Sequence, residues 1–109
     1  MKRITITDIG GEVVKEDDRY KVIDNKTLNN LVVSSTNLYA GKSTSGHSHA
    51  GQEEVYYFVQ GSGKMELDEE TINVNKGDVV LIEDGVFHRV HAGPRGVYFV
   101  CVFDGKRNH

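Results

Sequence analysis

Short runs in which apolar and polar residues alternate recur along the chain and are separated by turn residues. Residues 64–68 alternate strictly, with Met65 and Leu67 on one face, and residues 71–75 place Ile72 and Val74 on one face. Residues 31–40 alternate less regularly. Successive side chains of a strand point to opposite faces, so these patterns predict half-buried β-strands.

Other segments carry different strand signals. Residues 4–6 and 20–23 are short strand candidates, and an apolar and aromatic run over 55–59 is expected to end at Gly61, before a tight connection at 62–63. Residues 79–82 are continuously apolar, which predicts a strand buried on both faces. A loop at 92–96 is expected before a last strand at 97–103, and the charged residues 12–19 predict a solvated loop or edge.

The chain as a whole lacks helical periodicity. Many short strands separated by glycine-containing turns predict an all-β sandwich or barrel. The 109 residues are enough for one such domain, over 1–109, and too few for two.

Composition excludes several classes of partner. Thirteen basic and sixteen acidic residues give a net charge of -3. The basic residues form no stripe along the sequence, so binding to nucleic acid or to an anionic membrane is not expected. The longest apolar run, at 97–103, is too short for a membrane span, and residues 1–11 lack the apolar segment of a secretory signal. We therefore expect a cytoplasmic protein. The single cysteine, Cys101, lies between valines and is expected to be a small buried core residue.

Candidate metal-binding chemistry is concentrated in residues 41–61. His47 and His49 are two residues apart, so in an extended strand both imidazoles point the same way. A short loop would bring Glu54 back toward them. Two neutral nitrogens and a carboxylate are suitable ligands for a divalent metal.

A second segment, residues 77–88, adds His88, and together the two segments resemble the motifs of the cupin superfamily. The first motif matches at Gly41, His47, His49, Glu54 and Gly61, and the second at Gly77, Gly85 and His88. The chain departs from the second motif where Glu83 replaces proline and Ala92 replaces asparagine. The resemblance covers about residues 31–103 and is to small, single-domain cupins of the cupin 2 type. It implies a conical β-barrel of two antiparallel sheets, a homodimer, and N-terminal strands in residues 1–30 that pack on a partner subunit.

The resemblance also implies a ligand set: His47, His49, Glu54 and His88 around one divalent Fe, Mn, Ni, Co or Zn ion. Four ligands of an octahedron leave two adjacent positions for a chelating substrate, and the metal then acts as a Lewis acid. His91 should point away from the metal and is expected to be a surface residue, and His109 lies in the polar tail.

Strand parity sorts the neighbouring side chains. If Glu54 faces inward, so do Tyr56 and Phe58, while Tyr57 faces outward. Tyr56 either hydrogen-bonds a substrate oxygen or is a plain wall residue. Two cationic residues flank the ligands in sequence, Lys42 and Arg89. For each we expect a solvated side chain, and contact with an anionic substrate is the alternative.

Three functions remain open at this point. The first is a metal-dependent enzyme acting on a small oxygen-rich metabolite, similar to sugar-phosphate isomerases and epimerases, with Glu54 or Tyr56 moving the proton. The second is an Fe(II)-dependent dioxygenase, and the third is a non-catalytic cupin that binds a sugar or a small acid. All three imply a small-molecule ligand, and cupin resemblance alone does not choose among them.

Overall fold

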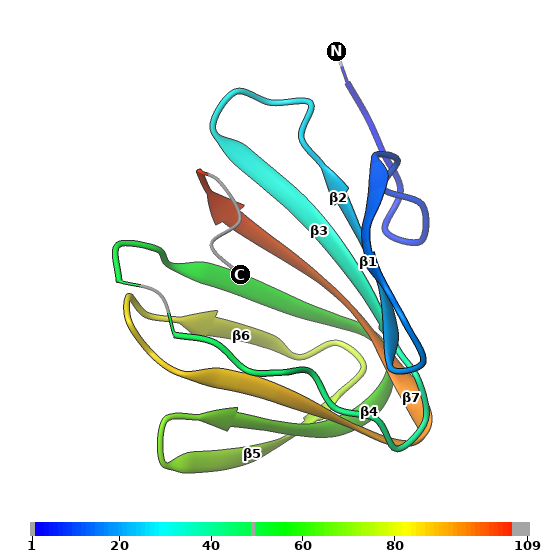
Figure 1. Ribbon diagram of the computed structural model, residues 1–109, viewed down its shortest axis with the longest axis vertical. Coiled ribbons are helices and arrows are strands. Elements are labelled where there is room, and N and C mark those ends of the chain that lie inside the picture. The colour runs from blue at the N-terminus through cyan, green and yellow to red at the C-terminus, as the bar shows by residue number, and fades with distance from the viewer. Residues whose placement is uncertain (1, 49, 106–109) are drawn as a thin grey trace.

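Two long strands, β4 (Glu54–Leu67) and β7 (His88–Asp104), pair with each other in antiparallel register over nearly their whole length in the computed structural model, which describes residues 2–48 and 50–105. Register shifts interrupt the pairing between Phe58 and Gln60 and between Gly61 and Gly63. Such bulges increase local twist and bend the strands. The β4–β7 ribbon therefore belongs to both layers of the fold, as Figure 1 shows.

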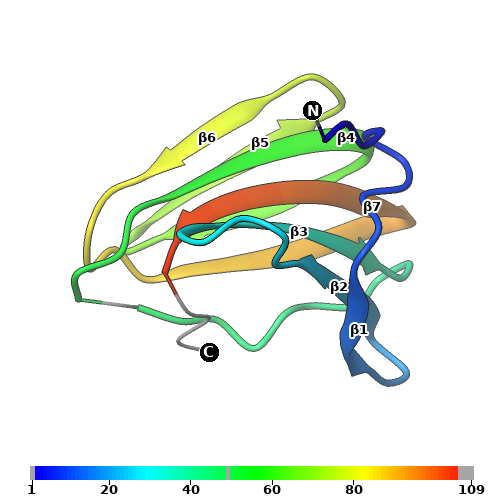
Figure 2. The same ribbon diagram turned by 90° about the horizontal axis from the view of Figure 1, so that it is seen from above.

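The remaining strands flank this ribbon. β3 (Leu31–Leu38) pairs with the second half of β7, β2 (Tyr20–Asn25) pairs with β3, and β1 (Glu12–Glu16) pairs with β2. On the other side, β5 (Glu70–Asn75) pairs with the second half of β4 and β6 (Val79–Ile82) with its beginning. All these pairings are antiparallel. The two layers of the fold meet where β4 and β7 bend, and the layers lie farther apart at the opposite end of the molecule (Figures 1 and 2). The predicted all-β fold is confirmed.

Inward-facing side chains fill the space between the layers. The core includes Phe58, Leu38, Met65 and Phe103, and Cys101 is buried as predicted. Tyr56 and Phe58 face inward and Tyr57 is exposed, which confirms the parity argument. Several inward positions on β2 and β3 are polar, namely Asp24, Ser34 and Thr36.

Some predicted strand limits were wrong. The breaks expected at 62–63 and 92–96 do not occur, because β4 and β7 continue through both segments with bulges in place of turns. Residues 4–6 form no strand and contribute only an isolated bridge between Thr5 and Asp8. The charged segment 12–19, predicted to be a solvated loop or edge, contains the edge strand β1.

The prediction that residues 79–82 are buried on both faces was also wrong. Val80 and Ile82 are buried, whereas Val79 is 56% and Leu81 72% exposed. Within the described residues, strand β6 pairs with β4 alone and forms an edge of the sheet, so only one of its faces meets the core. A continuous apolar run does not distinguish this arrangement from a strand covered on both sides.

The N-terminal residues lie against the outer face of the same chain's sheet. The Asn25 side chain donates a hydrogen bond to the Ile9 carbonyl at 2.6 Å, and the Tyr98 hydroxyl donates to the Ile6 carbonyl at 2.8 Å. Packing of residues 1–30 on a partner subunit stays a prediction. In residues 2–48 and 50–105 no helix is long and apolar enough to cross a membrane.

Candidate metal centre and its pocket

His47 and His88 are placed side by side by the backbone. The His47 N–H donates to the His88 carbonyl at 3.0 Å, and the His88 N–H donates to the His47 carbonyl at 2.8 Å. Directly opposed residues that exchange both hydrogen bonds carry their side chains on the same face. The ring centroids lie 6.4 Å apart. The segment between β3 and β4 thus brings a loop histidine to the first residue of β7.

Glu54 approaches the same place from the start of β4. Its Oε1 lies 3.6 Å from His88 Nε2, and Glu54 and His88 are only 2% and 3% exposed. His88 Nδ1 lies 3.1 Å from the Val86 carbonyl, which only accepts, so Nδ1 carries the proton in this contact. Burial lowers the pKa of His88 despite the opposing effect of that hydrogen bond. The neutral imidazole therefore presents the lone pair of Nε2 toward the Glu54 carboxylate.

This donor chemistry suits a divalent metal. An unprotonated imidazole nitrogen and a carboxylate are both electron-pair donors, and a backbone carbonyl that fixes the second ring nitrogen is the usual outer support of a ligating histidine. The structure places His88 next to Glu54 and next to His47, while His49 and His109 lie outside the described residues. Within those residues, no three His, Cys, Asp or Glu side chains form a metal-binding group by themselves.

A small pocket of about 40 Å³ opens beside the histidines. Tyr56 lines this pocket. Its ring stacks on Phe99, with the two centroids 5.1 Å apart, and its centroid lies 5.6 Å from that of the His88 ring. The full lining consists of Lys15, Tyr20, Val22, Thr36, Thr44, His47, Tyr56, His88, Arg89, Val90, Phe99 and Cys101. Glu54 is not part of this wall.

The structure separates the two cations that the sequence placed beside the ligands. Arg89 lines the pocket, and its Nε donates to the Thr44 carbonyl at 2.8 Å, so the expectation of a solvated side chain was wrong. Lys42 is exposed, lies 4.0 Å from Asp18, and does not line the pocket. Sequence reasoning missed Lys15 and Tyr20, because both precede the motif region and Lys15 lies in a charged stretch.

His91 lies outside the candidate centre. Its Nδ1 is 2.6 Å from the Ser43 hydroxyl, and its Nε2 contacts the Glu66 carboxylate. It follows His88 at an odd spacing on β7 and is half-buried, so it is not a free surface residue. The prediction that it is not among the candidate ligands agrees with this position.

Loops around the centre are held by hydrogen bonds that tolerate both departures from the motif. The Val86 N–H donates to the Glu83 carbonyl at 3.2 Å, so a turn forms there without proline. The Ala92 N–H donates to the Lys42 carbonyl at 2.8 Å within β7. Neither Glu83 nor Ala92 lines the pocket.

Comparison with known proteins agrees with this geometry. A sequence model of the Cupin domain family matches residues 35–103. The chain belongs to the cupin family. This cupin is 32% identical over 103 residues to the uncharacterized protein SCO3923 of Streptomyces coelicolor, a match that covers 94% of the chain and 95% of that protein. It is 40% identical over 50 residues to the uncharacterized protein MJ1618 of Methanocaldococcus jannaschii, covering 46% of the chain and only 40% of that protein.

A solved structure supports the same fold. KdgF from Halomonas sp. superposes with a TM-score of 0.78 at 18% identity, over 89% of the chain and 88% of that structure. At this identity the likeness concerns the fold alone. The predicted cupin fold is confirmed, whereas the reaction has to be argued from the site.

Proposed function

We propose that this cupin is a metal-dependent enzyme that acts on a small, oxygen-rich metabolite by isomerase-like or epimerase-like chemistry. The observation that carries the proposal is the buried Glu54–His88 pair, whose lone-pair-bearing atoms face each other at 3.6 Å. His88 also lines the pocket together with His47, so donors and substrate space adjoin. Structural metal sites are closed by protein ligands, whereas catalytic sites keep positions open beside such a space.

In this proposal His47, His49, Glu54 and His88 hold one divalent transition metal. When bound, the metal supplies Lewis acidity, which lowers the pKa of a substrate hydroxyl and stabilises negative charge beside a carbonyl. The protein's own part is to position the substrate and to move a proton. Tyr56 lines the pocket, whereas Glu54 does not, which favours Tyr56 as the proton-carrying group and Glu54 as a ligand.

Aromatic packing supports that assignment. Tyr56 stacks on Phe99 and meets the His88 ring edge-on, so its side chain is fixed between the core and the candidate centre. A fixed hydroxyl in an enclosed site transfers a proton at less entropic cost than a mobile one. The remaining alternatives, an Fe(II) dioxygenase and a non-catalytic binder of a sugar or small acid, use the same residues and are separated by turnover assays.

The test begins with metal content. We expect natively purified protein to carry about one transition-metal ion per chain, and Glu54→Gln and His88→Gln to lower metal affinity by at least about tenfold. His91→Gln is the matched control, because His91 lies on the same strand outside the candidate centre. Equal metal content in all four proteins, measured by elemental analysis, would refute the proposed ligand set.

Turnover separates the three functions. The wild-type protein and Tyr56→Phe, both metal-loaded, are assayed anaerobically for isomerisation of ketoses, aldoses, and hydroxy or oxo acids. We expect turnover without oxygen and a loss of at least about a hundredfold in kcat for Tyr56→Phe, the size typical of a missing general acid or base. Iron-dependent oxygen uptake would contradict the proposal and indicate a dioxygenase. A ligand that raises the melting temperature without being turned over would indicate a binding protein.

A further inference from the structure

The pocket wall carries two cations and no carboxylate. Lys15 and Arg89 both line it, together with two histidines, two tyrosines and two threonines. No Asp or Glu lines the pocket, so the side chains of its wall that carry a permanent charge, Lys15 and Arg89, are both positive. Like charges that share a partly enclosed space favour an anion between them.

A β-bulge directs Lys15 into this pocket. On β1 and β2, Val13 pairs with Ile23 and Lys15 pairs with Val22, so the register shifts by one residue between Val13 and Lys15. Val22 is a buried core residue, and paired residues share a face, so Lys15 points inward. Without the shift Lys15 would oppose Lys21 and face outward. A bulge that turns a side chain toward a cavity is common beside functional sites.

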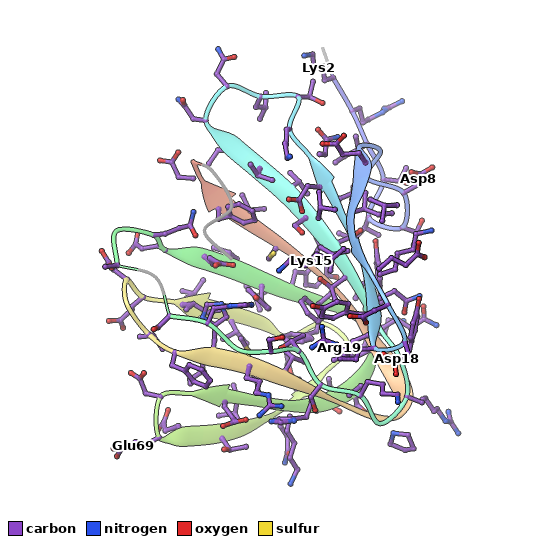
Figure 3. The ribbon with its side chains drawn as sticks, viewed as in Figure 1. Lys2, Asp8, Lys15, Asp18, Arg19 and Glu69 are labelled. Carbon is purple, nitrogen blue, oxygen red and sulfur yellow. The ribbon has the colours of Figure 1, made fainter. Side chains whose placement is uncertain are left out.

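Figure 3 shows the result. The Lys15 side chain lies over the middle of the molecule, whereas Lys2, Asp8 and Glu69 lie at its periphery. Lys15 also precedes residues 35–103, which the Cupin domain model matches. The candidate metal ligands lie within that match, whereas Lys15 comes from the β1–β2 hairpin that precedes it.

We propose that Lys15 is a specificity-determining residue that binds an anionic oxygen group of the substrate, and that this group is the carboxylate of a short-chain acid. The inference rests on the metal-dependent function proposed above and names its substrate class. A carboxylate and a phosphate share the required chemistry, and pocket size favours the carboxylate. About 40 Å³ of space holds about three water molecules, at roughly 10–15 Å³ each. That is room for the carboxylate group of an acid whose remaining atoms extend through the pocket mouth, and too little to enclose a whole sugar phosphate.

A structural role for Lys15 is the competing explanation. Asp24 is only 1% exposed and faces the interior from β2, two residues after Val22, the partner of Lys15. Side chains at such diagonal positions lie within reach of each other. If Lys15 only neutralises Asp24, removing its charge lowers stability and leaves ligand affinity unchanged.

The experiment is calorimetric titration of zinc-loaded and metal-free protein with malonate, with malonamide as a neutral probe of the same shape, and with inorganic phosphate. We expect Lys15→Met to weaken malonate binding by about tenfold or more, the size of a lost charge-assisted hydrogen bond, and Lys15→Arg to restore most of it. Lys42→Met is the matched control and should bind malonate as the wild type does, since Lys42 lies outside the pocket. Malonamide should bind weakly to every variant.

The outcomes separate this inference from the metal proposal. Unchanged malonate affinity in Lys15→Met, with metal content intact, refutes the role of Lys15 and leaves the metal site standing. If zinc does not bind, a tenfold loss in the metal-free titration still supports Lys15. Lysine-dependent binding of phosphate in preference to malonate supports the anion site and assigns it to a phosphorylated substrate, which overturns the carboxylate. A lower melting temperature with wild-type malonate affinity supports the Asp24 explanation.

Discussion

Gly61 determines, at the scale of one residue, whether the long ribbon can bend. Its φ is +83°, and a Cβ atom there would lie 2.2 Å from the Gly96 carbonyl oxygen. That oxygen belongs to the backbone of the paired strand β7 and cannot move aside without breaking the ladder. The glycine is required twice, for its left-handed conformation and for the close approach of two chains.

Gly61→Ala should therefore destabilise the protein by at least about 3 kcal/mol, a large part of the roughly 5–15 kcal/mol typical of a domain. Gly77→Ala is the control, because Gly77 also has a positive φ, +94°, but nothing lies within 4 Å of its added Cβ. It should lose only about 1–2 kcal/mol from the backbone conformation. Urea unfolding followed by circular dichroism measures both, and equal losses would contradict the steric argument.

Residue-level predictability depended on whether a position belongs to a motif. His88 and Glu54 were identified because their spacing matches a known pattern, and the structure places them 3.6 Å apart. Lys15 was not, because its direction follows from a one-residue register shift. Nothing in the sequence Glu-Val-Val-Lys-Glu marks a bulge, and strict alternation would put Lys15 on the same face as Val13, which the structure shows to be the exposed one.

At the scale of elements, the segment that carries His47 is fixed from two sides. Main-chain bonds at Thr44 and His47 attach it to β7. On the other side, Arg19 Nη1 donates to the Ser45 hydroxyl at 2.9 Å, and the same guanidinium contacts Asp17 and the Tyr20 hydroxyl. The β1–β2 turn therefore holds the histidine loop, and the hydrogen bonds from Arg19 lower the pKa of Asp17.

Arg19→Met should weaken metal binding by up to about tenfold, as expected when outer support of a ligand is lost, with little change in overall stability because the contact is exposed. Lys26→Met is the control, since it removes another exposed ion pair of the same hairpin, in which Lys26 Nζ lies 3.3 Å from Glu12 Oε1. Glu12 begins β1, at the end of this strand away from the β1–β2 turn and the histidine loop. Metal titration with a competing chelator measures both variants. Wild-type affinity in Arg19→Met would show that the main-chain bonds alone suffice.

Element existence was easier to predict than element ends. Alternation identified β3, β5 and the second half of β4, since each has one buried face. The glycines at 61, 63, 93 and 96 were taken for turns, but they occupy the bend of the β4–β7 ribbon, where backbones approach closely. The same glycine signal thus marks a turn or a bulge, and only the strand partner distinguishes them.

At the scale of the molecule, part of the outer face of the sheet is covered by the chain's own N-terminal residues, and the exposed part beyond them is apolar. Ser35 and Val100 point to this face and are buried, and the N-terminal residues lie nearby through the Tyr98–Ile6 hydrogen bond. The face continues onto β4 and β6, where four large apolar side chains are exposed in cross-strand pairs: Val55 with Leu81, and Tyr57 with Val79. Edge strands of monomers seldom present such a surface.

We expect a second copy of the chain to cover this patch, which gives the homodimer that the cupin resemblance implies. Leu81→Glu places a charge at the most exposed position of the patch, where Leu81 is 72% exposed in the single chain. The substitution should convert the dimer to a monomer at micromolar protein concentration. Light scattering after size-exclusion chromatography measures the change in mass. Leu28→Glu is the control, because Leu28 is also exposed, at 56%, but lies between β2 and β3, outside these pairs. A wild-type monomer, or equal dissociation in both variants, would contradict the expectation. Because the pocket lies on the inner side of the sheet, monomeric Leu81→Glu should keep its metal, so assembly and chemistry are separable in this fold.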